Sequence, residues 1–314
     1  MKCLNLLRLG FCTLVFFGSP GFFAGEALLP EDLQASIARQ QAVRLEVVHR
    51  DYREALEARF RAAEEVGDID LMVVIADERD APGMGETPEE LRVERDVLQG
   101  ALLRAERKRD ERILAALKEL RDPQEENVDL EAAVTALETR LAEPLLGPPL
   151  LAEDFFSPAQ RPEWRMRLPY GRRENRSGPD EVDGELIFRI HQEPGHFLVI
   201  SRDFPLLEEA EYHLSWEARG LRQDMETEQP EEPAVYAVGF GISDARYRAL
   251  RAGAGTRLNR TVWEMAPAPA GPEWEAQEGS VRVGPHMDQL MFRTSTGTGV
   301  WELRDLQIRR VYEH

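Results

Sequence analysis

The chain changes its hydrophobic periodicity at one proline-rich stretch, and this change constrains the fold more than any other feature. The stretch LAEPLLGPPLLAEDFFSP, residues 141–158, holds four prolines and a glycine, so no α-helix continues through it. Apolar residues recur every three or four positions before it and alternate after it. In a chain of 314 residues we expect two domains: helices over 26–146, a Pro-rich linker over 147–154 and an all-β sandwich over 155–314.

The front half carries long amphipathic helices. One apolar stripe runs at helical spacing, and charged residues cover the opposite face. Its members are Leu33, Ile37, Leu45, Val48, Tyr52, Leu56, Phe60, Ala63 and Val66. Gly67 and Asp68 then supply a helix stop and a new N-cap. A shorter helix is expected to follow and to end before the turn APGMGETPEE.

The same design recurs at an offset of 61 residues. The matched pairs are Ala55 with Ala116, Leu56 with Leu117, Asp68 with Asp129, Ile69 with Leu130, Val73 with Val134, and Arg79 with Arg140. Each unit is therefore expected to be a long helix, a turn and a shorter returning helix, and two such hairpins can form an antiparallel bundle or coiled coil. The pattern resembles helical hairpins that precede binding domains in bacterial envelope proteins. A spacer or self-association module and a plain helical domain without a partner both fit these residues.

The rear half reads as short strands. Nine alternating runs are separated by Gly, Pro and acidic loops, with no segment of helix length among them. The runs are EWRMRLPY, GELIFRIH, HFLVISRDF, EYHLSWEAR, AVYAVGFGI, TVWEMA, EGSVRVG, DQLMFRTS and VWELRDLQIRRV. This order predicts an antiparallel β-sandwich of jelly-roll type. In the last run the inward face changes near Asp305, which predicts a β-bulge there.

Three motifs give the rear half a resemblance to a known family. Tyr212, Leu214, Ser215 and Arg219 follow the pattern Tyr-x-Leu-Ser-x-x-x-Arg; Trp274 precedes VRVGPHMDQLMF; and Gly299, Trp301, Leu303, Asp305, Leu306 and Ile308 approximate a closing strand motif. Together they resemble the galactose-binding-like jelly roll of carbohydrate-binding modules of families 4 and 9. The resemblance implies a polysaccharide or glycan ligand. The sequence departs from the family pattern at Arg304, which replaces an acidic residue, and at Gly284.

Charge and the N-terminus limit the partners and the location. The formal net charge of −19 argues against nucleic acid or anionic lipid as a partner. Residues 1–25 have the layout of a secretory signal peptide, with a retained membrane anchor as the alternative. Cys3 and Cys12 both lie inside this segment, so the mature chain would have no cysteine. We therefore expect a secreted or periplasmic protein, without a membrane partner after cleavage.

No motif for catalysis, for a cofactor or for a metal is present in the sequence. The histidines His191, His196 and His213 fall on neighbouring predicted strands, but their spacing does not place them on one face. The acidic residues stand in no glycosidase pattern, and no nucleophile elbow, phosphate loop or dinucleotide fingerprint occurs. The sequence predicts a protein that is not an enzyme and that needs no cofactor.

Aromatic residues remain as candidates for stacking on sugar rings. The candidates are Trp164, Tyr170, Tyr236, Tyr247, Trp263 and Trp274. A sandwich of this size also buries aromatic residues, and Trp216 and Trp301 are expected in its core. Trp263 and Trp274 flank the loop APAPAGPE, which favours exposure for these two.

These observations together predict a secreted, non-catalytic binding protein. Its β-sandwich would recognise a glycan or a cell-envelope surface, and the helices would act as a spacer. The alternative is a structural adaptor whose sandwich binds another protein and whose helices mediate oligomerisation.

Overall fold

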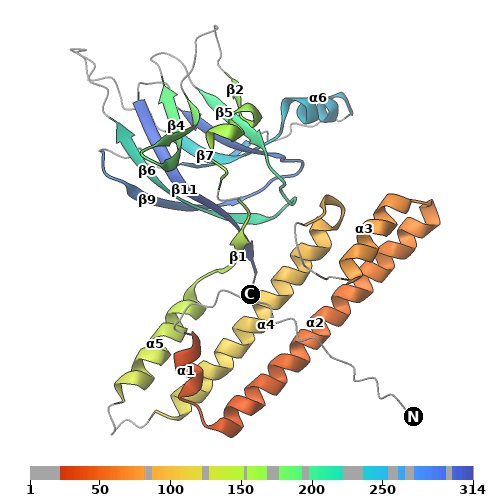
Figure 1. Cartoon of the computed structure of the whole chain (residues 1–314), viewed down its shortest axis with the longest axis vertical. Helices are drawn as coiled ribbons and strands as arrows, with labels where there is room; N and C mark the ends of the chain where they lie inside the picture. The colour runs from red at the N-terminus through yellow and green to blue at the C-terminus, as the bar shows by residue number, and fades with distance from the viewer. Residues whose placement is uncertain are drawn as a thin grey trace, which may run out of the picture. The chain divides into compact units, whose positions relative to one another are not determined.

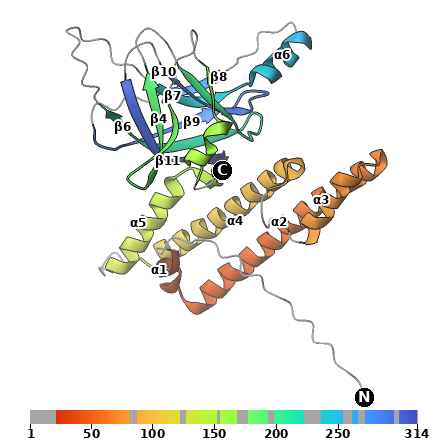
Figure 2. The same cartoon turned by 45° about the horizontal axis from the view of Figure 1, so that its top comes forward.

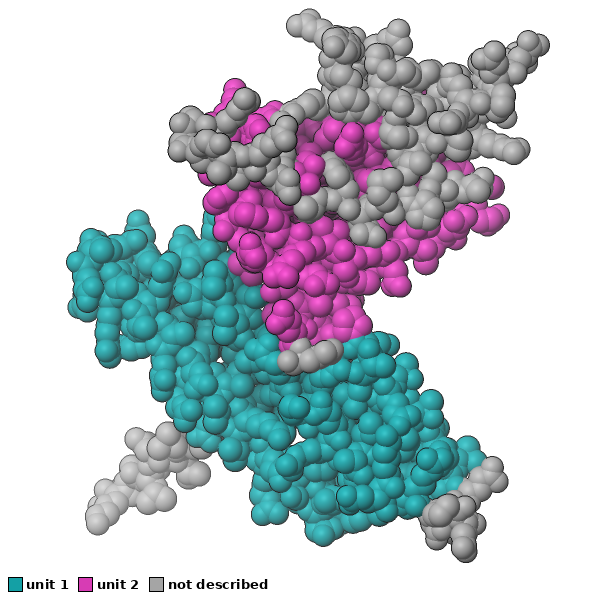
Figure 3. All heavy atoms as spheres, turned by 180° about the vertical axis from the view of Figure 1, so that it is seen from behind, with its two compact units in different colours: residues 1–143 teal, residues 144–314 magenta. Residues whose placement is uncertain are grey.

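The computed structural model describes residues 22–80, 82, 87–121, 127–151, 154–167, 177–192, 198–221, 236–253, 261–265, 272–294 and 299–313. The chain divides into two compact units, residues 1–143 and 144–314 (Figure 3). The first unit is helical and the second is built of antiparallel strands, as the change in periodicity predicts. Most of the predicted signal segment, residues 1–21, lies outside the described residues. No helix within the described ranges is both long enough and apolar enough to cross a membrane.

Unit 1 consists of two helical hairpins after a short first helix. Its elements are α1 (Phe22–Ala27), α2 (Glu31–Val66), α3 (Ile69–Asp80), η1 (Glu89–Leu91), α4 (Arg92–Glu119) and α5 (Val128–Ala142). Gly67 ends α2 in the left-handed conformation, with φ of 72°, which glycine adopts without a Cβ clash. Asp68 then caps α3 by accepting a hydrogen bond from the Leu71 N–H at 3.1 Å. The expected stop and cap are both confirmed.

The long helices α2 and α4 run antiparallel and side by side (Figures 1 and 2). Two apolar clusters join them, one at each end. The first contains Leu29, Ile37, Ile113, Ala116, Leu117, Leu130 and Val134; the second contains Tyr52, Leu56, Ile75, Leu91 and Leu98. The start of α2 therefore meets the end of α4, and the end of α2 meets the start of α4.

The structure corrects the repeat alignment for the short helices. Ile69 and Val73 were matched with the buried Leu130 and Val134, yet both are exposed, at 71% and 55%. Leu71 and Ile75 pack inward in their place, which makes the offset between α3 and α5 two residues shorter. The caps agree, because Asn127 caps α5 by accepting from the Leu130 N–H, as Asp68 does for Leu71. The two connections differ in length, so a single offset cannot fit both helices.

Buried charges also distinguish the two hairpins. Glu78, which takes the position of Leu137 in the second hairpin, is 3% exposed. Its carboxylate accepts a hydrogen bond from the Tyr52 hydroxyl at 2.6 Å and pairs with Arg95. In the second hairpin Asp110 is 2% exposed and pairs with Arg140, while its Oδ1 has no hydrogen-bond partner among the described residues.

Unit 2 is a sandwich of two antiparallel sheets. One sheet has the strand order β3-β4-β11-β6-β9, with β1 added to β11, and the other has the order β2-β5-β10-β7-β8. The strands are β1 (Leu145–Pro149), β2 (Arg165–Arg167), β3 (Gly178–Val182), β4 (Glu185–Gln192), β5 (Val199–Asp203), β6 (Glu211–Leu221), β7 (Tyr236–Gly241), β8 (Thr261–Met265), β9 (Glu275–Arg282), β10 (Gln289–Thr294) and β11 (Gly299–Tyr312). All nine expected runs contribute a strand.

One core fills the space between the sheets. Phe188, Phe240 and Phe292 are fully buried there. Trp216 and Trp301 also lie in this core, as predicted, at 3% and 4% exposure. The Trp216 indole N–H donates to the Tyr236 hydroxyl at 2.9 Å, which satisfies both polar groups inside the core.

Three elements of unit 2 differ from the expectation. Residues 145–149, which span the predicted boundary between the helical domain (26–146) and the linker (147–154), form β1, which pairs with the end of β11. The short β3 pairs with β4. A helix, α6 (Asp244–Gly253), contradicts the expectation that no helix occurs in this half. Tyr247 and Leu250 of this helix pack against the core. Asp244 lies in its first turn, where a negative charge interacts favourably with the helix dipole.

The bulge predicted in the last strand is confirmed. Between Arg304 and Gln307 the register of β11 against β6 shifts, so that two residues face one. Asp305 occupies the bulge with φ of 51°, a left-handed conformation that Asp tolerates better than most residues. Trp301 and Leu303 before the bulge and Ile308 after it all reach the same core.

Two acids of α4, the buried Asp110 and the partly buried Glu106, should make unit 1 less stable as the pH rises. Burial raises the pKa of Asp110 from 3.8 and that of Glu106 from 4.5, and Glu26 adds to the effect at Asp110; Arg140 and Arg109 oppose it. At a pH above the ordinary pKa values of these two acids, the folded state therefore binds more protons than the unfolded state. The free energy of unfolding then falls as the pH rises, until the pH has passed the raised pKa values of the folded state. We expect the variant Asp110→Asn to gain melting temperature relative to the wild type between pH 4 and pH 7. A difference in melting temperature that stays constant with pH would contradict this assignment.

Candidate functional site

A break in strand pairing along β11 opens a site in unit 2. On the side away from β6, β4 pairs with β11 as far as Leu303, and β1 pairs with it from Arg309 onward. The Leu150 N–H also donates to the Ile308 carbonyl at 2.9 Å. No described strand covers the intervening edge, residues 304–307, which is where the bulge lies.

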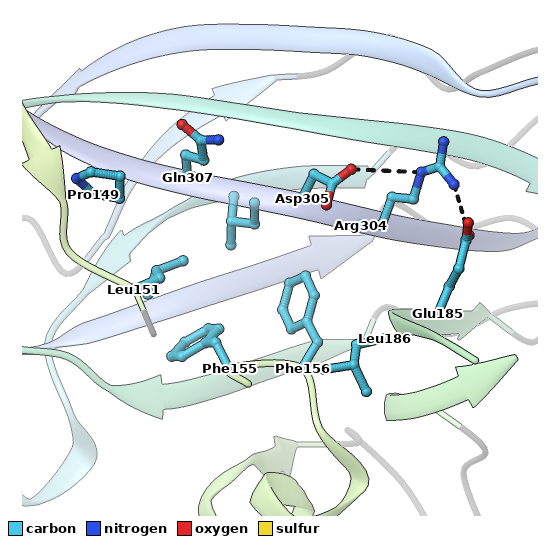
Figure 4. Close-up of a pocket in the computed structure, with 10 residues that line it drawn as sticks. Pro149, Leu151, Phe155, Phe156, Glu185, Leu186, Arg304, Asp305 and Gln307 are labelled. Carbon is cyan, nitrogen blue, oxygen red and sulfur yellow. Dashed lines mark hydrogen bonds and ion pairs between the residues drawn. The ribbon is translucent and has the colours of Figure 1, made fainter. Parts of the chain in front are cut away.

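The gap forms a cavity of about 480 Å³, the size of a small-ligand site (Figure 4). Its lining residues are Pro149, Leu151, Phe155, Phe156, Glu185, Leu186, Arg304, Asp305, Leu306 and Gln307. Phe155, Phe156 and Leu306 belong to the buried core, at 9%, 5% and 8% exposure. Six of the ten lining residues are apolar, and an amide, a guanidinium and two carboxylates complete the lining.

Arg304 is held in place by acidic residues from two neighbouring strands. Its Nε donates to Glu217 on β6 and its Nη1 donates to Glu185 on β4, each at 2.7 Å. Asp305 lies further away, 3.8 Å from the Arg304 Nε (Figure 4). The hydrogen bond to Glu217 is the main cause that raises the pKa of Arg304. The guanidinium is therefore a fixed, charged wall of the cavity.

A second charge network lies beside it on the same sheet. Glu302 is 1% exposed and accepts hydrogen bonds from Arg189 at 2.7 Å and from Arg219 at 2.6 Å. Arg189 also donates to Asp180 on β3 at 2.7 Å. A buried carboxylate costs free energy unless it is paired, and here both of its oxygens have guanidinium partners. The network fixes the arginines across four strands.

Trp274 lies over two of these arginines. The Arg304 Cζ is 4.2 Å and the Arg219 Cζ 4.5 Å from the centroid of the Trp274 ring, which is cation–π geometry. Trp274 is only partly buried, and it immediately precedes β9. Arg304 thus contacts the ring and also lines the cavity, so the two features adjoin.

Among the predicted stacking residues whose side chains the structure describes, only one lies next to this site. Trp274 is that residue. Trp263 lies in β8 of the opposite sheet, where it pairs with Gly239 of β7, and its side chain is outside the described part of the structure. Tyr170 lies outside the described residues altogether. Tyr247 is partly buried on α6, against the core.

Trp164 and Tyr236 are corrections to the sequence analysis. Trp164 is 7% exposed and packs against Phe188, with ring centroids 4.5 Å apart. Tyr236 is fully buried, and this burial raises its pKa to about 12. Both rings are buried in the core, and unlike Phe155 and Phe156 neither of them lines the cavity.

Sequence reasoning missed the cavity and the role of Glu185, Glu217 and Glu302. The one signal was Arg304, which stands out as a departure from the closing motif. No group of three or more His, Cys, Asp or Glu side chains suited to a metal ion occurs within the described ranges. The carboxylates that line the cavity, Glu185 and Asp305, are 57% and 72% exposed.

Comparisons with known proteins give fold-level likeness only. No protein-family model and no curated protein matches the chain. Among solved structures, a carbohydrate-binding module of family 61 in complex with β-1,4-galactotriose is 15% identical, covering 52% of this chain and 99% of that one, with a TM-score of 0.31. The CBM22-1 xylan-binding domain of Paenibacillus barcinonensis Xyn10C is 13% identical, covering 48% and 87%, with a TM-score of 0.31.

A third neighbour is an enzyme domain. The enzymatically active domain of bacteriophage CBA120 tailspike protein 4 is 9% identical with a TM-score of 0.32; the match covers 48% of this chain and 19% of that one.

We expect Glu302→Gln to destabilise unit 2 markedly. The substitution removes the negative charge that two guanidinium groups share, and those arginines are only 29% and 27% exposed. Their partial exposure reduces the loss below that of a fully buried pair, to about 2 to 4 kcal/mol of the free energy of unfolding. Urea denaturation measures it. The control Glu278→Gln, on β9 and 77% exposed, should cost less than about 0.5 kcal/mol; equal losses would show that the network is dispensable.

Proposed function

We propose that unit 2 binds a glycan, with a sugar ring in the β11 cavity. The observation that carries this proposal is the composition of the cavity: six apolar lining residues, two of them phenylalanines, next to Glu185, Asp305, Arg304 and Gln307. A sugar ring has apolar C–H faces, which pack on aromatic rings, and hydroxyl groups, which pair with carboxylates, amides and guanidinium groups. The cavity offers both kinds of partner within about 480 Å³.

Trp274 extends the proposed site along the sheet. Its ring shares Arg304 with the cavity, so a ligand longer than one ring can leave the cavity and contact the tryptophan. Both of the arginines under the ring are fixed by carboxylates. The platform is therefore already ordered before a ligand arrives, which reduces the entropy lost on binding.

The geometry supports binding without catalysis. A glycosidase needs one carboxyl group with a raised pKa, which burial usually provides, facing a second across the bond to be cleaved. Glu185 and Asp305 are mostly exposed, and both approach the same guanidinium, that of Arg304. In the proposal, unit 2 is a secreted or periplasmic recognition module, residues 1–25 are a signal peptide, and unit 1 is its helical spacer.

A second candidate, an adaptor that self-associates through its helices, is favoured by exposed valines on unit 1. Val43 and Val47 of α2 are 61% and 38% exposed, and Val93 and Val97 of α4 are 60% and 61% exposed. Each pair is four residues apart, and so shares one face of its helix. A spacer does not need these apolar faces.

The glycan proposal predicts a specific loss in the variant Trp274→Ala. A glycan array with the full chain identifies the best oligosaccharide, and calorimetry then measures its affinity. We expect Trp274→Ala to weaken binding about tenfold, as loss of an aromatic stacking contact does. The variant Glu278→Ala, exposed on the same sheet, should bind as the wild type does. Loss in Trp263→Ala but not in Trp274→Ala would move the site to the other sheet.

The adaptor candidate makes a separate prediction for light scattering. If the valine faces associate, the full chain should be dimeric or larger at micromolar concentration, and Val43→Lys combined with Val97→Lys should return it to a monomer. The substituted positions are exposed, so we expect the melting temperature to change little. A wild-type chain that is monomeric at all concentrations tested would exclude this candidate.

A further inference from the structure

The charges around the β11 cavity are unequal, and this imbalance bears on the class of glycan. Among the ten lining residues that the structure describes, Arg304 is the one cation, whereas Glu185 and Asp305 are both acidic. Glu217, behind the guanidinium, adds a third carboxylate. The adjoining network is balanced, since Glu302 and Asp180 face Arg189 and Arg219. The site as a whole therefore carries an excess of negative charge.

Arg304 is already committed to protein partners. Its Nε and Nη1 donate to Glu217 and Glu185, and the ring of Trp274 covers the guanidinium at 4.2 Å. An anionic sugar entering the cavity would have to compete with two carboxylates at hydrogen-bonding distance. It would also approach a chain whose net charge is −19. Both effects disfavour uronic acids and sulfated sugars.

Asp305 differs from Arg304 in this respect. Its backbone is held in place, but its carboxylate has no short hydrogen bond to Arg304. Its backbone is fixed by the bulge, with φ of 51°, and its side chain is 72% exposed. Its one described charge contact is Arg304 at 3.8 Å, longer than a hydrogen bond. Its carboxylate can therefore accept from a ligand in the cavity. A cationic donor suits it best, since a charge-assisted hydrogen bond is the stronger kind.

We infer that the cavity selects sugars that carry a free ammonium group, as in deacetylated amino-sugar oligomers, and that Asp305 determines this selectivity. The inference rests on the proposed glycan-binding function. The ring packs on Phe155 and Phe156, and the ammonium lies between Asp305 and Glu185 at the side of the cavity that Arg304 closes. Affinity therefore falls as salt is added and as the pH rises through the pKa of the amine.

The test compares three oligomers of equal length on the full chain by calorimetry at mildly acidic pH and low salt. The glucosamine hexamer carries ammonium groups, the N-acetylglucosamine hexamer is neutral and the galacturonate hexamer is anionic. We expect affinity in that order, with the first binding about tenfold more tightly than the second. The variant Asp305→Asn keeps a residue that tolerates the left-handed conformation, so the bulge should persist. Asp305→Asn should remove most of the difference in affinity between the glucosamine and N-acetylglucosamine hexamers, and the affinity for the neutral hexamer should not change.

Glu209→Gln is the matched control. Glu209 also has a positive φ, 61°, is 70% exposed and lies 3.9 Å from an arginine, Arg282, but it does not line the cavity. It should leave all three affinities unchanged. If Glu209→Gln lowers glucosamine binding as much as Asp305→Asn does, the selectivity is a general effect of the acidic chain and the inference fails.

The remaining outcomes separate the inference from the function on which it rests. If the neutral or the galacturonate hexamer binds as tightly as the glucosamine hexamer, charge selection is wrong and glycan binding stands. If a hexalysine peptide binds with the same dependence on Asp305, the cavity recognises cations without a sugar, and the inference is overturned. If no hexamer and no glycan on the array binds, the proposed function fails together with the inference.

Discussion

The β-bulge at Asp305 is the constraint on which the rest of unit 2 depends. A strand alternates its faces strictly, so without the extra residue the second half of β11 would turn its apolar side chains away from the core. With it, Leu303 and Ile308 both reach the core from one continuous strand. The same irregularity coincides with the place where the pairing of β4 with β11 has ended and the pairing of β1 with β11 has not begun. The central strand thus spans the whole sheet and still leaves a cavity at its middle.

Charged residues on the same sheet form a layer that stiffens this cavity. Arg304 and Arg219 would be mobile as single surface side chains, and isolated surface ion pairs contribute little to stability. Here each is tied to a carboxylate on a neighbouring strand, and Glu302 is buried between its partners. The layer orients the ring of Trp274 as well as the wall of the cavity. In this way a protein with a net negative charge holds Arg219 and Arg304 in cation–π contact with the ring of Trp274.

Much of the fold follows from local pattern, and much of the site does not. The nine alternating runs and the facing change at Asp305 predict strands and a bulge, because both depend on residues close in sequence. The sequence pattern does not predict β1 and β3, because LLGPP and GPDEV are short and contain proline. It does not predict α6 either, because only Tyr247 and Leu250 of its described side chains pack on the core. The cavity depends on where the pairing of β4 and of β1 with β11 stops, and no local pattern encodes such long-range pairing. The loop APAPAGPE beside Trp274 favours exposure of that ring, whereas the burial of Trp164 depends on Phe188, a residue distant in sequence.

The pairing of β1 with β11 has a mechanical consequence for a recognition module joined to a spacer. The chain enters unit 2 at Leu145, opposite Tyr312, and β1 then runs along β11 toward the bulge as far as Pro149. A pull on the entering chain, resisted by a ligand held at the bulge, acts parallel to this short strand. Hydrogen bonds between strands lie across such a pull, so they share the load together instead of breaking one after another. If unit 2 is the proposed recognition module and unit 1 its spacer, the strand formed from the proline-rich stretch is loaded in shear.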